Sequence, residues 1–459
     1  MARFSTLSLA RLLLSATGAL ATIKVDVNDA DSIKSAAALV AEDLMSLYDG
    51  AIPGILPGPP PDGDYYWWTG GALWAAMLDY RSRTGDARYD DKIAEGLLFQ
   101  RGPHDDYLTP NWTATAGNDD QAVWGLAALL AAETGFAAPK GVDGSDGLQW
   151  ADLPQHVFDE QQSKDRRVEN GTCAGALRWQ IYQINAGYNY ISTFANLAYA
   201  NLGARLSLLG GNKTQAAAVE DAFNLLQTKE FIDGNFNVFD GAQVPDCDQI
   251  NKVQFSNVAA LAVEGAAVMF NTTGGDEKWQ KLLDGLLGRT IDVFFPDGVA
   301  EEVACESNGQ CNTDMTFFKS FLHRSLATTV RVAPHTASII LPVLKTSAAA
   351  AVESCVGGDN GRMCGFVWSG DGDNETGAGS QMSVLSALVS LLPAGTVQGT
   401  PGTGNSSTPS SSSAGPSNTS GGSSEPSSTP PGSAGTHTGV NAVVLLGGLL
   451  LASSGLHRA

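Results

Sequence analysis

The chain is poor in positive charge and in histidine. It has 27 lysines and arginines against 48 aspartates and glutamates, which gives a formal net charge of −21. Nucleic acids and anionic lipid surfaces attract basic proteins, so this balance argues against both as partners. The six histidines show no H-E-x-x-H pattern and no other paired-ligand spacing. We therefore predict no metal site.

Common catalytic signatures are also missing. The chain contains no G-x-S-x-G nucleophile elbow, no P-loop and no dinucleotide-binding fingerprint. It gives no sign of serine-hydrolase or nucleotide chemistry, and we predict that it needs no cofactor. Alternating strand patterns are rare as well, and residues 236–239 are the best short strand candidate.

Residues 1–21 are predicted to form a secretory signal peptide. Arg3 and Arg11 supply positive charge, residues 12–14 are leucines, and residues 19–21 form a small-residue cleavage site. The apolar part is too short to span a membrane. The protein is therefore expected to be exported.

The other end predicts a GPI anchor on a stalk. Residues 396–433 are rich in Ser, Thr, Pro and Gly, a composition that cannot build a core. Small residues, a polar spacer and an apolar tail follow through residues 434–459, in the order of a GPI signal whose tail is removed. A C-terminal membrane helix is the alternative, but the apolar run is shorter than the ~20 residues that a span needs. We expect attachment at Ser433, contact with the membrane only through the lipid, and a location at the extracellular face of the plasma membrane, with the cell wall as the alternative.

Cysteines and glycosylation sequons agree with an oxidising compartment. The six cysteines are even in number. Local pairs Cys305–Cys311 and Cys355–Cys364 would leave Cys173 with Cys247, although sequence alone allows other pairings. N-x-Ser/Thr sequons occur at Asn111, Asn170, Asn212, Asn271 and Asn374, and in the stalk at Asn405 and Asn418.

Residues 22–395 contain no internal linker and are predicted to form one helical domain. Apolar residues recur at i, i+3, i+4 and i+7 in most segments. Turns such as Gly85-Asp86 and Gly211-Asn212 separate them, because glycine can end one helix and Asp or Asn can cap the next. Helices in hairpin pairs predict an all-α fold, a closed (α/α)6 toroid, with an open solenoid as the alternative. The expected helices lie near residues 32–49, 67–83, 87–101, 118–134, 150–163, 188–208, 213–229, 255–271, 276–294, 313–331, 335–352 and 379–392.

The neighbouring aspartates Asp119 and Asp120 are the most informative residues. They stand where a helix is expected to begin, and both project along sides that carry apolar residues such as Val123. Burying unpaired carboxylates is costly, whereas a carboxylate pair in a cleft is what glycoside hydrolysis requires. The structural alternative is an ordinary helix start, with Asn118 as N-cap and acidic residues favoured by the helix dipole.

Other segments carry groups that could hold a sugar. Residues 65–68 are four consecutive aromatics, which cannot all face one core, so Trp67 or Trp68 is expected to line a cleft, whereas Trp74 is expected in the core. Asp314 and Lys319 lie five residues apart and are more readily explained as a structural pair than as catalytic groups. Side chains that hydrogen-bond hydroxyls gather at Arg178, Gln180, Asn185, Tyr188, Asp240 and Asp314.

Four motifs together resemble glycoside hydrolase family 76, the endo-α-1,6-mannanases. They are Trp67-Trp68-Thr69-Gly70-Gly71, Gly117-Asn118-Asp119-Asp120-Gln121, Arg178-Trp179-Gln180 with Asn185, and Asn312-Thr313-Asp314 with Phe318-Lys319. With the two end signals, the chain is similar to the fungal membrane-anchored branch implicated in building the cell wall. The resemblance implies an (α/α)6 toroid and a retaining mechanism with Asp119 as nucleophile and Asp120 as acid/base. The motif residues Trp67, Trp68, Asn118, Gln121, Arg178, Gln180, Asn185 and Asp314 are expected to bind substrate, together with Tyr188 and Asp240 from the polar clusters.

The resemblance also implies the substrate. The donor would be an α-mannoside, either mannan or the mannose core of a GPI glycan. Water would then give hydrolysis, and a β-glucan acceptor would give transglycosylation. A non-catalytic mannan-binding wall or adhesion protein on the same scaffold is the alternative. A retaining pair needs carboxyl groups about 5–5.5 Å apart, which consecutive residues at a helix start can supply.

Overall fold

A computed structural model describes residues 22–58, 63–137, 147–245, 247–370 and 375–394. The predicted signal peptide, stalk and GPI signal, with Ser433, lie outside these residues. The sequons at Asn374, Asn405 and Asn418 also lie outside them.

Twelve α-helices make up most of the described domain, and each overlaps one of the expected segments. They are α1 (Ala30–Ser46), α2 (Trp68–Thr84), α3 (Asp90–Phe99), α4 (Asn118–Glu133), α5 (Asp152–Gln161), α6 (Thr193–Gly210), α7 (Lys213–Thr228), α8 (Ser256–Thr272), α9 (Glu277–Phe294), α10 (Phe318–Val332), α11 (Ala337–Glu353) and α12 (Ala378–Val389).

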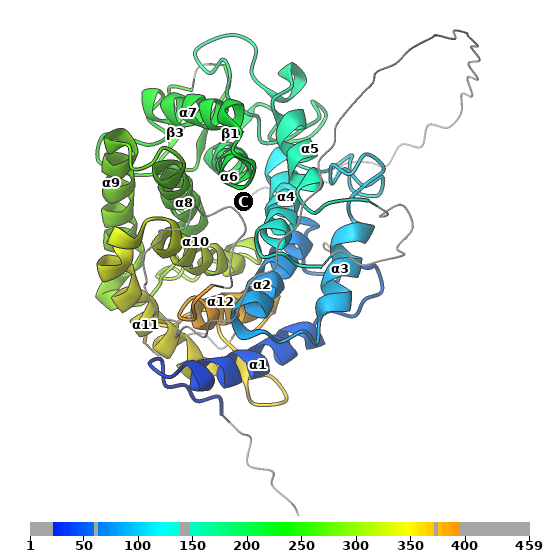
Figure 1. Cartoon of the computed structure of the whole chain (residues 1–459), viewed down its shortest axis with the longest axis vertical. Helices are drawn as coiled ribbons and strands as arrows, with labels where there is room; N and C mark the ends of the chain where they lie inside the picture. The colour runs from blue at the N-terminus through cyan, green and yellow to red at the C-terminus, as the bar shows by residue number, and fades with distance from the viewer. Residues whose placement is uncertain (1–21, 59–62, 138–146, 246, 371–374, 395–459) are drawn as a thin grey trace, which may run out of the picture. The chain divides into compact units, whose positions relative to one another are not determined.

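The even-numbered helices form a closed inner ring. Each of α2, α4, α6, α8, α10 and α12 packs against the next, and α12 packs against α2 (Figure 1). The odd-numbered helices lie outside and pack against inner neighbours, such as α7 on α6, α9 on α8 and α1 on α12. The described domain is therefore an (α/α)6 toroid, as predicted. The closure of the ring rules out the open solenoid.

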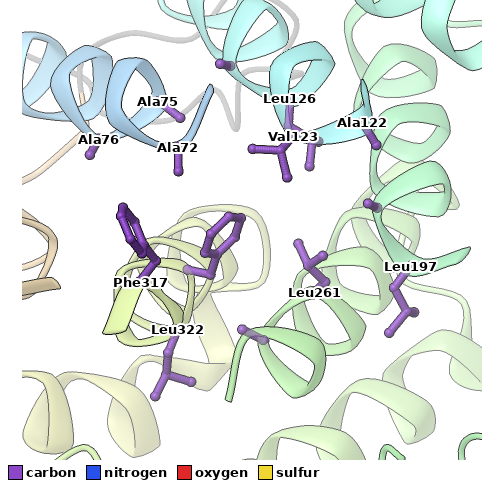
Figure 2. Close-up of a cluster of buried hydrophobic side chains, with 14 of the residues drawn as sticks. Ala72, Ala75, Ala76, Ala122, Val123, Leu126, Leu197, Leu261, Phe317 and Leu322 are labelled. Atoms are coloured by element: carbon purple, nitrogen blue, oxygen red, sulfur yellow. The ribbon is translucent and has the colours of Figure 1, made fainter. Parts of the chain in front are cut away.

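Burial follows these two layers. Inner helix α12 is buried along its whole length, whereas outer helix α7 buries only one stripe that includes Val219, Phe223 and Leu226. Figure 2 shows apolar side chains of several inner helices gathered in the ring, among them Ala72, Val123 and Leu261.

The short strand candidate at residues 236–239 is confirmed at one position only: Val238 forms an isolated antiparallel bridge with Ile232 and belongs to neither sheet. Phe236 has a left-handed backbone with φ 63°, and the Asp233 carboxylate accepts the N–H groups of Asn235 and Asn237, which makes a turn. Two small antiparallel sheets occur elsewhere in the described residues. The first joins β1 (Tyr190–Ser192), β2 (Gly241–Gln243) and β3 (Ile250–Asn251), and the second joins β4 (Cys355–Gly357) and β5 (Met363–Cys364).

All three suggested disulfides are present: Cys173–Cys247, Cys305–Cys311 and Cys355–Cys364. Among the described sequons, Asn111, Asn170 and Asn212 are exposed. Asn271 is half-buried, and its Nδ2, the atom that would carry a sugar, donates to the Val332 carbonyl at 2.9 Å. The structure therefore argues against glycosylation of Asn271.

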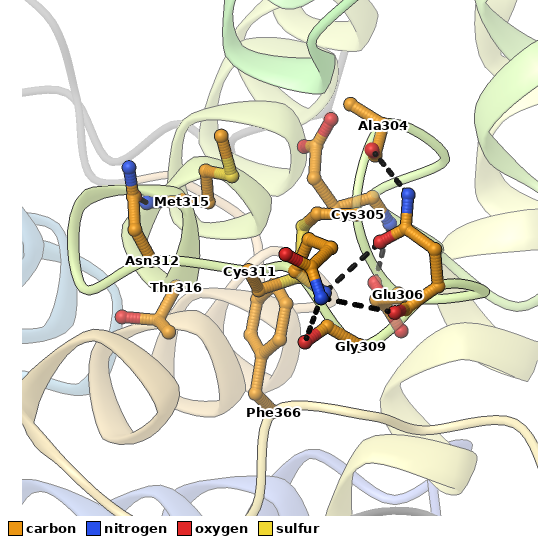
Figure 3. Close-up of a disulfide and its surroundings, with 12 residues drawn as sticks. Ala304, Cys305, Glu306, Gly309, Cys311, Asn312, Met315, Thr316 and Phe366 are labelled. Atoms are coloured by element: carbon orange, nitrogen blue, oxygen red, sulfur yellow. Dashed lines mark hydrogen bonds between the residues drawn. A yellow bond between two sulfur atoms is a disulfide. The ribbon is translucent and has the colours of Figure 1, made fainter. Parts of the chain in front are cut away.

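Lys319 anchors the segment that precedes α10, but its partner is not Asp314. Its Nζ lies 2.7 Å from Glu306 Oε1, and both side chains are buried. The same Nζ donates to the Phe366 carbonyl at 2.8 Å and lies 4.4 Å from the ring centre of Phe366. The predicted Asp314–Lys319 pair is therefore wrong. Glu306 belongs to a loop closed by the Cys305–Cys311 disulfide (Figure 3), so this loop is tied to the start of α10.

Candidate active site

The starts of the inner helices bring several predicted site residues to one end of the ring. Asp119 and Asp120 lie in the first turn of α4, and Trp68 begins α2. Asp314 begins the short 3-10 turn η3 (Asp314–Phe317), which leads into α10. The backbone carbonyl of Asp240 accepts a hydrogen bond, at 2.9 Å, from the N–H of Thr193, which is the first residue of α6. The positive ends of these helix dipoles therefore point to the region that holds the carboxylates.

The two neighbouring aspartates are tied to the start of α4. The N-cap is Gly117 and not Asn118, which is the first helical residue. The Gly117 N–H donates to Asp120 Oδ2 at 2.7 Å, and the Asp120 N–H donates to Asp119 Oδ1 at 3.0 Å. Both side chains are half-buried. The helix start thus orients each carboxyl through a backbone donor.

Burial dominates the electrostatics of this pair. It raises the pKa of Asp119 well above the ordinary range, and the negative charge of Asp120 raises that pKa further. Burial also raises the pKa of Asp120 to about 6, and the charge of Asp314 adds to this rise. Hydrogen bonds to Asp119 from the Asp120 N–H and the Trp179 side chain oppose the rise in its pKa. Such close carboxyls titrate as a unit, so between the two pKa values the pair holds one proton.

Gly117 gives the Asp119 carboxyl its space. A Cβ atom at this position would lie 2.2 Å from Asp119 Oδ1. The backbone angles of Gly117, φ −88° and ψ 164°, are open to any residue. Close approach, rather than backbone freedom, therefore favours glycine here, because a Cβ would push the Asp119 carboxyl aside.

Trp68 and Asp314 form one side of the site. Trp68 Nε1 donates to Asp314 Oδ1 at 3.2 Å, and the Trp68 ring packs edge-on against Phe317 with centroids 5.3 Å apart. Burial raises the pKa of Asp314. Trp68 is half-buried, and its contact with a substrate stays a prediction.

Asp240 lies on another side, beside the small sheet. Tyr190 Oη donates to Asp240 Oδ2 at 2.5 Å, and Asn251 Nδ2 donates to the same oxygen at 2.8 Å. Burial raises the pKa of Asp240. The two donors to this oxygen fix the orientation of the carboxyl. The Asp240 side chain is half-buried.

Trp67, Asn118 and Gln121 were predicted to bind substrate, but the structure buries them. Trp67 is 5% exposed and stacks on Trp124 with centroids 5.3 Å apart. Trp74 is in the core, as expected. Asn118 and Gln121 are both 0% exposed. These side chains have no surface to offer a substrate, so the prediction for them is wrong.

Asn118 and Gln121 instead hold the start of α4. Arg166 Nη1 donates to Asn118 Oδ1 at 2.7 Å, and Asn118 Nδ2 donates to the Arg178 carbonyl at 2.9 Å. Gln121 Nε2 donates to Glu160 Oε2 at 2.9 Å. Part of the family motif around the aspartates therefore holds the start of α4 in place.

Arg178, Gln180, Asn185 and Tyr188 shape the loop beside the aspartates. The Arg178 guanidinium lies 4.3 Å from the centre of the Tyr188 ring and donates to the Tyr188 carbonyl at 3.0 Å. Asn185 Nδ2 donates to Gln180 Oε1 at 3.2 Å, and the Gln180 backbone bridges to Gly117. These contacts give the four residues a role in loop conformation, and substrate contact by them stays a prediction.

Gly117 and Trp179 stand in the motifs quoted above, but no role was predicted for them or for Tyr190. The sequence did offer one signal, a glycine immediately before an acidic pair. The position of Trp179 depends on the path of the loop between α5 and α6, which no local pattern reveals.

Comparison with known proteins covers this whole domain. The sequence model for glycosyl hydrolase family 76 matches residues 32–400. The mannan endo-1,6-alpha-mannosidase DCW1 of Candida glabrata is 38% identical over 371 residues, which cover 80% of this chain and 81% of that protein. The mannan endo-1,6-alpha-mannosidase DFG5 of Saccharomyces cerevisiae is 35% identical over 390 residues, with coverage of 84% and 83%.

Solved structures agree. Dfg5 from Chaetomium thermophilum, crystallised in complex with glucosamine, has a TM-score of 0.76 and 45% identity, and the match covers 81% of this chain and 94% of that one. An inactive variant of an α-1,6-mannanase from Salegentibacter, in complex with α-1,6-mannotriose, has a TM-score of 0.62. At 14% identity, over 78% of this chain and 98% of that one, it shares the fold. With the sequence matches, these findings show that the chain belongs to glycosyl hydrolase family 76 and is a glycoside hydrolase.

Proposed function

We propose that this protein is a retaining endo-α-1,6-mannosidase whose catalytic pair is Asp119 and Asp120. The observation that carries the proposal is the geometry of the pair: two consecutive, half-buried carboxyls at a helix start, each held by a backbone donor. The substrate class follows from the names of the relatives DCW1 and DFG5. The inactive Salegentibacter variant, in which two consecutive aspartates are replaced, supports the same kind of pair.

The reaction needs the proton on Asp120. The Asp119 carboxylate attacks C1 of the mannosyl unit while Asp120 gives its proton to the departing glycosidic oxygen, so the C1–O bond breaks and an ester bond to Asp119 forms. Asp120, now ionised, then takes a proton from water or from a sugar hydroxyl, whose oxygen attacks C1 and releases Asp119. The charge of Asp314 raises the pKa of Asp120 and acts in this direction, against the burial that raises the pKa of Asp119.

The sugar donor, the acceptor and the cellular location of the reaction are part of the proposal. We propose mannan or a GPI-core glycan as donor, and either water or wall β-glucan as acceptor. The predicted signal peptide and GPI signal support a site of action at the outer face of the plasma membrane or in the cell wall.

A direct assay tests this function. The purified protein is incubated with α-1,6-mannan or a GPI glycan, with and without a β-glucan oligosaccharide, and the products are analysed by mass. Shortened mannan indicates hydrolysis, and a mannosylated β-glucan indicates transfer. Binding of mannan without any product from wild type, over all donors and acceptors, would instead support the non-catalytic alternative.

The pH dependence follows from the shared proton. Only the singly protonated pair is active, and the lower pKa of the pair corresponds to the value of about 6 at Asp120. As pH falls below 6, both carboxyls become protonated and the nucleophile is lost, so kcat/KM should fall about tenfold per pH unit. At high pH the remaining proton is lost and the rate should fall again. A kcat/KM that stays constant from pH 4 to pH 7 would contradict this account.

Gly117→Ala should separate activity from folding. The new Cβ would displace the Asp119 carboxyl, because it would lie 2.2 Å from Oδ1, and a shift of about 1 Å at a reacting group can cost about 10²-fold in rate. We expect that loss in kcat/KM with a nearly unchanged melting temperature, since the backbone angles suit alanine. Gly288→Ala in α9, where a Cβ has nothing within 4 Å, is the control and should keep full activity. Equal activity of the two variants would refute the spatial argument.

A further inference from the structure

Lys319 belongs to one of the four family motifs, but it takes no part in the proposed reaction. It is 0% exposed. Its Nζ lies 2.7 Å from Glu306 Oε1 and donates to the Phe366 carbonyl at 2.8 Å. The ring centres of Phe366 and Trp368 each lie 4.4 Å from the same atom. The buried ammonium is therefore held by one carboxylate, one carbonyl and two aromatic rings.

Stability is a weak explanation for this buried pair. Taking an ammonium and a carboxylate out of water costs about as much free energy as their attraction returns, and apolar residues of similar size are often no less stable. A buried pair does impose a defined geometry, because Nζ must reach the oxygens of Glu306 and Phe366 at hydrogen-bond distance. The position of the chain around Lys319 is thus what the pair determines best.

Glu306 is itself fixed to the ring. It lies in the loop closed by the Cys305–Cys311 disulfide (Figure 3), and its Oε1 also accepts the N–H of Glu302. The buried carboxyl of Glu302 in turn accepts the N–H of Ser256, the first residue of α8, at 3.2 Å. Lys319 therefore connects the start of α10, through this loop, to the start of α8.

A short helical path leads from Lys319 to Asp314. Lys319 is the second residue of α10, and η3, which begins at Asp314, runs directly into this helix. Phe317 and Phe318, at the junction, both have helical backbone angles. Because no flexible link separates the two residues, a shift of Lys319 would move η3 with it.

The helices α12 and α2 meet the other side of η3. Ser383 Oγ on α12 donates to the Thr316 carbonyl at 2.9 Å, and a Cβ at Gly379 would lie 2.0 Å from Thr316 Oγ1. On α2, Trp68 Nε1 donates to Asp314 Oδ1 at 3.2 Å. This distance is at the long end of the usual range for a hydrogen bond, so a small shift of η3 would break it.

We propose that Lys319 and Glu306 are positioning residues, whose buried ion pair holds η3 where the Asp314 carboxyl meets the Trp68 indole. Lys319 touches no substrate and acts only through Asp314 and Trp68. The effect on catalysis rests on the proposed function, whereas the effect on the Trp68–Asp314 hydrogen bond does not.

The first test follows that hydrogen bond directly. Lys319→Met removes the charge and keeps an unbranched side chain of similar length. The Trp68 indole N–H is observed by 1H–15N NMR of tryptophan-labelled protein and assigned with Trp68→Phe. Its signal should move toward that of Asp314→Ala, which lacks the acceptor, and its exchange with solvent should be about tenfold faster than in wild type. Arg205→Met, which removes a buried cation elsewhere in the ring, is the control and should leave the signal in place.

A kinetic double-mutant cycle is the second test. Lys319→Met should lower kcat/KM about tenfold to a hundredfold, because groups at the site are displaced. In the Asp314→Ala background the same change should cost less than about threefold, because the two residues act through one path. Equal losses in both backgrounds would overturn the proposed effect on catalysis.

Glu306 supplies variants in case Lys319→Met does not fold. Glu306→Ala should then reproduce the changes expected for Lys319→Met, whereas Glu306→Gln keeps an oxygen acceptor for Lys319 and should retain most of the wild-type NMR signal and rate. A Trp68 signal identical to wild type, in whichever of Lys319→Met and Glu306→Ala folds, overturns the proposal. This outcome is independent of whether the protein turns over mannan.

Discussion

Asp119→Asn will abolish turnover of an α-1,6-mannoside, by a factor on the order of 10⁴ or more. The amide occupies nearly the same space, but it cannot attack C1. The variant should stay folded and even gain stability, because one of two half-buried, mutually repelling carboxyls is removed. Product analysis and thermal denaturation of the same preparation check both parts.

The chain supplies a matched control. Asp90 and Asp91 are also consecutive aspartates in the first turn of a helix, α3. Asp91 is exposed, and Asp90 pairs with Arg81. Asp91→Asn should therefore retain full activity. If Asp119→Asn keeps more than a few per cent of wild-type activity, the nucleophile is a different residue.

Arg205→Met will destabilise the domain by about 3–5 kcal/mol. Arg205 on α6 makes two bonds to Glu133 on α4, at 2.8 and 2.7 Å, and lies 3.4 Å from Glu264 on α8. All three side chains are less than a tenth exposed. Methionine fills similar space but leaves both carboxylates in the ring without their main cation. Denaturant unfolding measures the loss.

A surface pair provides the comparison. Lys278 and Glu220 lie 2.6 Å apart with side chains 46% and 48% exposed. Because solvent screens such a pair, Lys278→Met should change the unfolding free energy by about 1 kcal/mol or less. If Lys278→Met and Arg205→Met changed the unfolding free energy equally, the buried pair would contribute no more stability than the surface pair.

The fold could be predicted because its determinants are local. Helical periodicity and Gly-Asp or Gly-Asn turns recur along the chain, and each described helix overlaps a predicted one. The strands could not be predicted in the same way. β1 has three residues, and its partner β2 begins at Gly241, far along the chain. Residues 190–192 carry a helical pattern that this pairing overrides.

The acidic pair could be recognised from the apolar helix that it begins. Asp90-Asp91 and Asp119-Asp120 look alike in isolation, but the residues after Asp119 are apolar around the helix, as an inner helix requires. Burial of individual polar residues was harder to foresee. Asn118 is buried because Arg166 reaches it from the segment after α5, and Trp67 because Gln100 and Trp124 cover it. Such partners are distant in sequence. Motif residues that support the helix were therefore predicted to bind substrate.

The most direct measurement is the covalent intermediate. A fluorinated α-mannosyl donor that forms the intermediate quickly and releases it slowly is added to the protein, and the digested peptides are analysed by mass spectrometry. The account predicts one mannosyl group on Asp119, and none when Asp119 is replaced by Asn. A label on Asp120, or an unlabelled enzyme that turns over mannan with inversion at C1, would contradict it.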